Sequence, residues 1–184
     1  ADVQWAVEPI NALAEAGIIN GVAERTFAPA DNVTRAEYIT MLMRAFGEDT
    51  TPAETVPFAD VQAGEWYYEP IAKAVALGVT NGYTVNDETY FGVDDNISRE
   101  DMMVMAYRAM TTFGIDIPSN KGYETFADQS DISDYAVEAI EKMYCAEIVN
   151  GVGSNMLDPK GSAERAQSAK IIYGLLEMEG TVNE

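Results

Sequence analysis

The sequence predicts an all-α protein: three tandem helix-loop-helix repeats in a pseudo-three-fold, three-pronged arrangement. The main observation is a four-residue segment at 34–37 (TRAE) that recurs at 98–101 (SRED) and, degraded, at 164–167 (ERAQ). The arginines of the three copies are 64 and 66 residues apart, and each copy opens a run with the apolar spacing of an amphipathic helix. Units of this size bury too little surface alone, so the repeats are expected to pack on one another.

Each repeat is expected to hold two helices joined by a loop, with no strands. In the first repeat, four apolar positions of the first helix are predicted to face inward: Trp5, Ile10, Leu13 and Ala14. The second repeat matches them without gaps: Trp66, Ile71, Ala74 and Val75. Gly17 and Gly78 are expected to end these helices, whereas Glu147 occupies that position in the third repeat.

The chain is expected to form one domain over residues 1–184, with repeats at 1–47, 58–111 and 126–180. The segment 48–57 reads as a linker, because it holds two prolines, three threonines and three acidic residues. The loop that follows the Asn-Gly turn is three residues longer in the second repeat than in the first.

The repeated motif has a direct physical interpretation. Thr34 and Glu37 form a capping-box pattern at a helix start, and Ser98 with Asp101 is a weaker version. The arginine then occupies the first helical position, beside unpaired amides and the positive end of the helix dipole, a place that favours an anion. Two interpretations stay open on spacing alone. The arginine binds an anionic ligand, or it bridges to a carboxylate of a neighbouring repeat.

The composition excludes several classes of function. The net charge of −20, from 11 basic and 31 acidic residues, argues against nucleic acid and anionic membrane surfaces as partners. The chain has no histidine, and its acidic loop segments at 86–88 and 94–96 lack EF-hand spacing, so we expect no metal and no cofactor. Cys145 is the single cysteine and cannot form an intrachain disulfide. No apolar run is long enough to span a membrane, and we expect no signal peptide in these residues.

The unit Phe-x-Asp, then Trp, Ile, Gly-Ile/Val-x-Asn-Gly, Phe-x-Pro and Thr-Arg-Ala-Glu resembles the S-layer homology (SLH) repeat. The resemblance covers nearly the whole chain, and three tandem copies are the usual arrangement of that family. It implies an extracellular module on the bacterial surface that binds secondary cell-wall polysaccharide, often one carrying pyruvate ketals, and attaches the rest of a larger surface protein to the wall.

The resemblance also implies which residues contact the glycan. The motif arginines would bind the pyruvate carboxylate in grooves between adjacent repeats, at helix starts capped by Thr34 and Ser98: Arg35, Arg99 and, with a degraded motif, Arg165. The acidic residues before the first helices would accept hydrogen bonds from sugar hydroxyls: Asp2, Asp60 and Asp128. The turn glycines would let backbone amides approach the sugar: Gly21, Gly82 and Gly151. Trp5 and Trp66 would offer a ring face to a pyranose, the alternative being that they pack in the core.

Departures from the family pattern leave an alternative function. The third repeat has Glu164 in place of the Thr cap and Tyr135 in place of the tryptophan, and a carboxylate beside Arg165 is expected to compete with an incoming anion. The leading hypothesis is a non-catalytic cell-wall anchor. The alternative is a protein-interaction or assembly module of a surface protein that has lost glycan binding. No recurring acid pair with a catalytic role can be named, so an enzyme is not expected.

Overall fold

The computed structural model describes residues 3–23, 26–47 and 49–180. The elements in these ranges are six α-helices, three short 3₁₀ helices and two strands: η1 Gln4–Ala6, α1 Val7–Glu15, α2 Arg35–Phe46, α3 Tyr68–Ala76, β1 Tyr83–Val85, β2 Glu88–Tyr90, α4 Arg99–Phe113, η2 Gln129–Asp131, η3 Asp134–Ala136, α5 Val137–Cys145 and α6 Arg165–Glu179. The mostly helical fold and the six helices agree with the prediction. Within the described ranges, none of these helices has the length and apolar character needed to cross a membrane.

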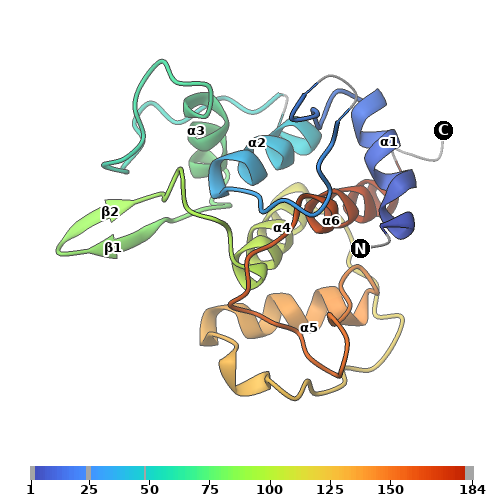
Figure 1. Cartoon of the computed structure of the whole chain (residues 1–184). Helices are drawn as coiled ribbons and strands as arrows, with labels where there is room; N and C mark the ends of the chain where they lie inside the picture. The colour runs from blue at the N-terminus through green and yellow to red at the C-terminus, as the bar shows by residue number, and fades with distance from the viewer. Residues whose placement is uncertain (1–2, 24–25, 48, 181–184) are drawn as a thin grey trace.

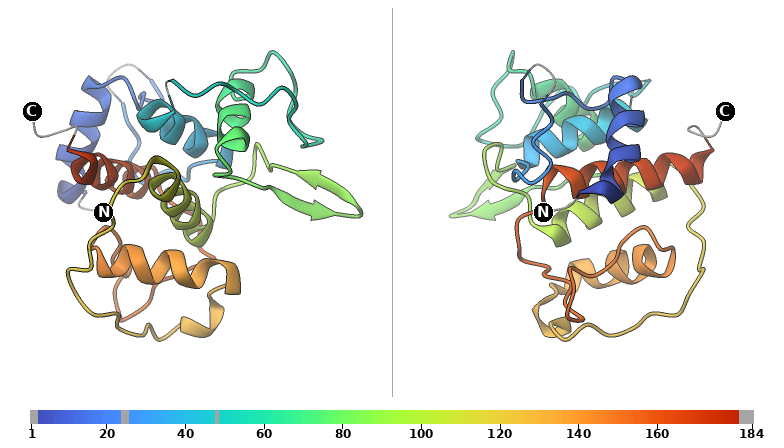
Figure 2. Two further views of the ribbon diagram at one scale, coloured as in Figure 1. Left: turned by 180° about the vertical axis from the view of Figure 1, so that it is seen from behind. Right: turned by 45° about the vertical axis from the view of Figure 1, so that its right-hand side comes forward.

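The three helices that begin at the motif arginines lie at the centre of the molecule (Figure 1). Helices α2, α4 and α6 contact one another, and each also packs against the first helix of the next repeat: α2 on α3, α4 on α5, and α6 on α1. Figure 2 shows α5 on one side of α4 and α6, and α1, α2 and α3 on the other. The second helix of each repeat therefore packs on the first helix of the next repeat, and the last helix of the chain packs on the first.

Backbone hydrogen bonds join the segments just before the three motif helices. The Val33 amide donates to the Ala163 carbonyl (3.0 Å), the Ala163 amide to the Ile97 carbonyl (2.9 Å), and the Ile97 amide to the Val33 carbonyl (3.0 Å). These three residues are fully buried. Each repeat therefore donates to one neighbour and accepts from the other, and the hydrogen bonds form a closed ring.

The core is made mainly by the motif helices, as the apolar spacing predicts. Ile39, Leu42 and Met43 of α2 are buried, and Leu13 and Ile71 of the first helices pack against the same core. Two predicted core positions of the first repeat are wrong, because Ala14 is exposed and Trp5 is 47% exposed. Trp5 lies in the 3₁₀ turn that precedes α1, so its side chain is out of phase with the buried stripe of that helix.

The expectation that loops alone connect the helices is also wrong for the second repeat. Strands β1 and β2 form an antiparallel hairpin in which Tyr83 pairs with Tyr90 and Val85 with Glu88. Asn86 and Asp87 connect the strands with φ of 49° and 67°, the signs that a tight primed hairpin turn requires. The three extra residues of this loop supply the length for the strands, and the hairpin projects from the helical body (Figure 1).

The first helices of the three repeats end in the same backbone conformation. Gly17 and Gly78 have φ of 71° and 69°, which confirms their predicted role, and Glu147 adopts φ of 63° at the equivalent position. A side chain with a Cβ is strained in this region of backbone space. The third repeat therefore keeps the turn although it lacks the glycine.

Candidate functional site

The motif helices begin with side-chain caps. The Thr34 hydroxyl accepts a hydrogen bond from the Glu37 amide (3.2 Å), and the Glu37 carboxylate accepts one from the Thr34 amide (2.8 Å). This confirms the predicted capping box. The Ser98 hydroxyl accepts from the Asp101 amide (3.1 Å), which leaves the Asp101 carboxylate available for other partners. The caps fix the helix starts and hence the positions of the arginines that follow them.

The motif arginines are buried at the first position of their helices, with exposures of 7% for Arg35, 5% for Arg99 and 6% for Arg165. Each reaches into the next repeat and donates from its Nε to the carbonyl of the loop anchor residue. The three distances are 2.7 Å from Arg35 to Phe91, 2.9 Å from Arg99 to Leu157, and 3.0 Å from Arg165 to Phe27. These bonds run around the molecule in one sense, and they leave the terminal guanidinium nitrogens for other contacts.

The contacts of those terminal nitrogens differ between repeats. Arg35 Nη1 is 2.5 Å from the Asp101 carboxylate, so the bridging interpretation holds for this arginine. Arg165 Nη2 donates to the Asn20 carbonyl (2.7 Å), and its Nη1 is 3.8 Å from the Glu37 carboxylate.

Arg99 has a neutral partner at the equivalent place. Its Nη1 donates to the Gln167 side-chain oxygen at 2.8 Å. Burial lowers the pKa of the Arg99 guanidinium, and the negative charges of Asp158, Glu164 and Asp128 act in the opposite direction. Within the described residues, Arg99 is thus the motif arginine that makes no direct ion pair. Its neighbour is the third repeat, which has Gln167 in the degraded motif.

Each motif arginine lines a cleft, and each cleft draws on all three repeats. We name the clefts by their arginines. The Arg35 cleft includes the Asn81–Gly82 turn and Tyr135. The Arg99 cleft includes the Asn150–Gly151 turn and Trp5, and the Arg165 cleft includes the Asn20–Gly21 turn and Trp66. The arginine comes from one repeat, the turn from the next, and the aromatic residue from the third.

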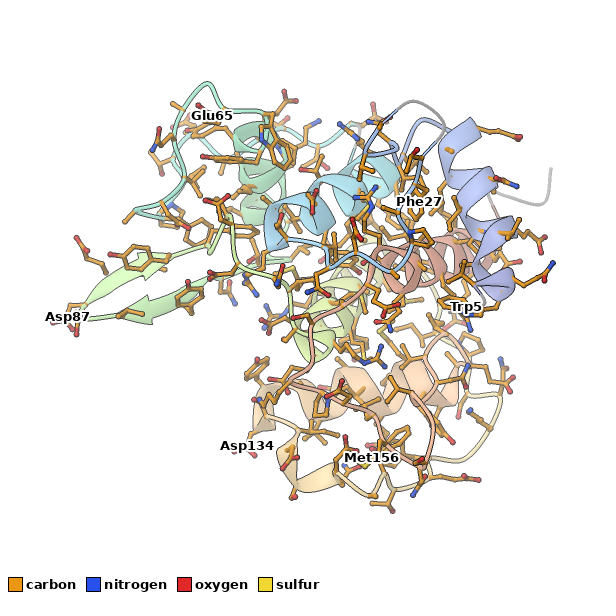
Figure 3. The ribbon with its side chains drawn as sticks, viewed as in Figure 1. Trp5, Phe27, Glu65, Asp87, Asp134 and Met156 are labelled. Atoms are coloured by element: carbon orange, nitrogen blue, oxygen red, sulfur yellow. The ribbon has the colours of Figure 1, made fainter. Side chains whose placement is uncertain are left out.

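The aromatic residues of the clefts are largely exposed. Trp66 and Tyr135 are each 57% exposed, and Trp5 is 47% exposed. Figure 3 shows Trp5 at the end of α1 beside α6. The Lys170 ammonium lies 5.4 Å from the centre of the Trp5 ring. These rings are therefore available at the cleft surface, and core packing does not explain them.

Each cleft holds a second cation that the motif analysis did not identify. Arg108 lies in the Arg35 cleft, Lys170 in the Arg99 cleft and Arg44 in the Arg165 cleft. Arg44 and Arg108 both stand nine positions after a motif arginine, and this repeated spacing could have revealed them. Lys170 has no counterpart at its position and carried no such signal. Among the residues that the structure describes, six basic side chains thus line the three clefts, and the whole sequence has 11 basic residues.

The predicted acidic residues have structural partners. The Asp60 carboxylate accepts hydrogen bonds from the amides of Phe91 (2.8 Å), Gly92 (2.7 Å) and Val93 (3.0 Å). Burial alone would raise the pKa of Asp60, but these amides hold it below its usual range. Asp128 is bound in the same way by two amides of the equivalent loop, at residues 157 and 158. The role of both as acceptors for sugar hydroxyls stays a prediction, and Asp2 lies outside the described residues.

The turn glycines also have a reason within the fold. A Cβ at Gly21, Gly82 or Gly151 would lie 2.4–2.6 Å from a backbone carbonyl oxygen of the same loop. Glycine therefore lets the loop fold back on itself at these three turns. All three line clefts, so their predicted approach to a sugar is compatible with this role.

Glu164 acts on a different arginine from the one expected. It is the N-cap residue of α6, yet it lines the Arg99 cleft and not the Arg165 cleft. The carboxylate near Arg165 is that of Glu37, from the first repeat. Neighbouring residues at a helix start point in different directions, which separates Glu164 from the arginine that follows it.

No cluster of three acidic, histidine or cysteine side chains in the described ranges could hold a metal ion.

Comparison with protein families matches the chain to the S-layer homology domain at residues 2–39, 57–103 and 125–169. An amylopullulanase from Thermoanaerobacterium thermosulfurigenes is 36% identical over 180 residues, which is 97% of this chain and 9% of that protein. Exoglucanase XynX from Acetivibrio thermocellus is 35% identical over 175 residues, covering 94% of this chain and 16% of that protein.

The S-layer protein sap from Bacillus anthracis is 30% identical over 178 residues, covering 96% of this chain and 21% of that protein. The chain therefore corresponds to a small part of the relatives it matches, between about a tenth and a fifth of their length. Each of the three matched segments contains one copy of the arginine motif. The chain belongs to the S-layer homology domain family and holds three tandem SLH repeats.

Proposed function

We propose that this chain is a non-catalytic anchoring module that binds an acidic secondary cell-wall polysaccharide in its three clefts. The observation that carries the proposal is the placement of positive charge. The chain has a net charge of −20 and 11 basic residues, and within the described residues six of them line the three clefts, each of which has an exposed aromatic ring. A carboxylate on a sugar, such as a pyruvate ketal, matches this combination of a cation pair and a ring face.

The acidity of the rest of the chain does not prevent such binding. Repulsion between the module and an anionic polymer is screened beyond about 8 Å at physiological ionic strength. Inside a cleft, a charge-assisted hydrogen bond to a carboxylate contributes roughly 1.5–3 kcal/mol. Several sugars of one polymer could occupy several clefts, which would add avidity.

The Arg99 cleft supports an anion best. Its arginine is hydrogen bonded to the neutral Gln167, and Lys170 adds a second positive charge beside Trp5. Its volume is about 570 Å³, against about 300 Å³ for the Arg35 cleft. Asp158 and Glu164 line the same cleft and could accept hydrogen bonds from sugar hydroxyls. In the Arg35 cleft an anion must compete with the Asp101 carboxylate.

We also propose that the three repeats are related by pseudo-three-fold symmetry, with one cleft at each motif arginine. The closed ring of backbone hydrogen bonds and the cyclic contacts of the arginine Nε atoms support this arrangement. As part of a longer protein, the module would act outside the cell at the bacterial surface. Its partners would be the wall polysaccharide and the rest of that protein. The S-layer protein sap among its relatives supports this location.

Co-sedimentation with Gram-positive cell-wall sacculi tests the proposal, before and after mild acid extraction of the secondary polymer. We expect the wild type to bind only unextracted sacculi. Trp5→Ala and Lys170→Gln should weaken binding about five- to tenfold each, since both side chains line the Arg99 cleft. The matched control is Lys142→Gln, an exposed lysine of α5 that lines none of the three clefts.

Thermal melts of every variant separate loss of binding from loss of fold. Binding that survives extraction would assign the module to peptidoglycan or protein instead. No binding by the folded wild type, together with self-association, would overturn the anchor and favour an assembly module.

A further inference from the structure

The hairpin of the second repeat carries an aromatic face that the anchoring motifs do not explain. Tyr83 and Tyr90 are directly paired across the two strands, and their rings stack with centres 6.3 Å apart and an interplanar angle of 25°. Side chains two residues apart on a strand share a face, so Val85 and Glu88 lie on this face as well. Together with Asn86, these four side chains line a hollow of about 220 Å³.

The two tyrosines are held by carboxylates, and Tyr83 is exposed whereas Tyr90 is half-buried. The Tyr83 hydroxyl donates to Asp95 (2.7 Å), and the Tyr90 hydroxyl donates to Glu88 (2.8 Å). The hydrogen bond to Asp95 raises the pKa of Tyr83 to about 12, so the ring stays neutral at physiological pH. Tyr83 is 42% exposed and Val85 is 48% exposed. The hairpin thus presents a fixed ring pair beside two carboxylates.

This face is continuous with the Arg35 cleft. Tyr83 lines both the hairpin hollow and the Arg35 cleft, and the Arg35 guanidinium carbon lies 5.9 Å from the centre of its ring. Asp95, which accepts the Tyr83 hydroxyl, also accepts a hydrogen bond from the Arg35 amide through its backbone carbonyl, at 2.9 Å. A chain of sugars that begins at Arg35 would therefore meet the tyrosines as it leaves the cleft.

The other two clefts lack this extension in the part of the chain that the structure describes. Their equivalent loops form a single bridge pair, Ala23 with Thr26 and Gly153 with Met156. The residue after the turn glycine is Val22 or Val152 in place of Tyr83. Met156 precedes the loop anchor of the third repeat, where Tyr90 precedes that of the second. The aromatic face is therefore specific to one cleft.

We propose that the Tyr83–Tyr90 face of the hairpin is an additional subsite that stacks a neutral pyranose adjoining the acidic sugar held at Arg35. This inference rests on the proposed glycan binding. A pyranose has an apolar face of C–H groups that fits flat on an aromatic ring, and its hydroxyls can donate to the carboxylates of Glu88 and Asp95. The acidic residues at the hairpin disfavour an anionic sugar there, so the subsite takes an uncharged residue.

Two-dimensional ¹H–¹⁵N NMR of the full chain tests the subsite with two probes. The first is the methyl glycoside of a single pyruvylated hexopyranose, and the second is a mixture of fragments of at least three sugars released from sacculi by mild acid. We expect the single sugar to shift the amide signals of Arg35 and Gly82 but not those of residues 85–88. The longer fragments should shift both groups.

Substitutions at Tyr90 give the energetic test. Tyr90→Ala should weaken the longer fragments at the Arg35 cleft about five- to tenfold, or about 1–1.4 kcal/mol, and leave the single sugar within twofold. Tyr90→Phe keeps the ring and should retain most of the affinity. Met156→Ala, at the equivalent position of the third repeat, is the matched control and should leave the Arg35 cleft unchanged.

The outcomes separate the subsite from the general proposal. If longer fragments shift only the Arg35 cleft, and Tyr90→Ala binds them as the wild type does, the subsite is refuted while glycan binding stands. If neither probe shifts any cleft, both proposals fail. If the signals of residues 85–88 in Tyr90→Ala no longer report a hairpin, the wild type decides: the subsite stands if the longer fragments shift residues 85–88 and is refuted if they do not.

Discussion

Replacing Asp60 by alanine would remove the acceptor that organises the loop under the Arg35 cleft. Its carboxylate accepts from three consecutive backbone amides, those of residues 91–93, at 2.7–3.0 Å. The first of these residues is Phe91, whose carbonyl accepts a hydrogen bond from Arg35 Nε. The substitution would therefore leave three amides without their partner and weaken this contact between the first and second repeats.

The size of the effect follows from these contacts. A hydrogen bond to a charged group contributes roughly 1.5–3 kcal/mol net. The three bonds share one half-buried carboxylate and are not additive, so we expect a total loss of about 3 kcal/mol. For a domain of 184 residues, each kcal/mol lowers the melting temperature by about 2–4 °C. Asp60→Ala should therefore melt about 6–12 °C below the wild type, and Asp60→Asn about half as far, because the amide oxygen can still accept.

Calorimetry measures the melting temperatures, with the exposed Asp94→Asn as control. Sacculus binding of each variant is then measured well below its melting temperature. A drop of less than about 2 °C for Asp60→Ala would refute the structural role. If binding were lost at the same time, Asp60 would instead be a ligand contact, as the family resemblance predicts.

Three further predictions concern stability. Lys160→Ala should lower the free energy of unfolding by about 1–2 kcal/mol in denaturant titrations, because Lys160 is the cation bound to the buried Glu100 carboxylate; an unchanged midpoint would contradict this. Glu147→Gly should raise that free energy by about 0.5–1 kcal/mol, since it relieves a left-handed conformation with φ of 63°, and a lower melting temperature would refute it. The folded-state pKa values of Asp60, Asp128 and Glu100 are lowered, so their stabilisation is present above the unfolded values of about 4 and is lost as pH falls through the folded values. Melting temperatures should thus hold down to about pH 5 and fall below about pH 4, and a rise on acidification would contradict the assignment.

Local patterns predict the helix starts and ends well, because their causes lie within a few residues. The Thr34–Glu37 capping box and the glycine at position 17 depend on neighbouring groups alone, and both have the expected geometry. The buried stripe of α2 follows from helical periodicity in the same way. The 3₁₀ turn that carries Trp5 away from the core leaves no such pattern, so the prediction that Trp5 faces the core is wrong.

The make-up of the clefts could not be read from one repeat. Each cleft combines an arginine, a turn and an aromatic residue from three different repeats, and this depends on each motif helix packing on the next repeat. The partner of each arginine is set by the neighbour's residue two positions after its own motif arginine: Asp101, Gln167 or Glu37. Had the order of packing been known, these three residues would have shown which arginine faces a carboxylate and which faces a neutral side chain.

The closed ring of repeats, completed by the packing of α6 on α1, has a consequence for how the module unfolds. In an open stack of repeats, the end units have one neighbour each, so the stack can unravel from its ends. Here every repeat has two neighbours, and loosening any one of them breaks two interfaces at once. Unfolding should therefore be concerted, with no partly frayed form that keeps some clefts and loses others. A module of this kind would hold its polymer fully or release it fully.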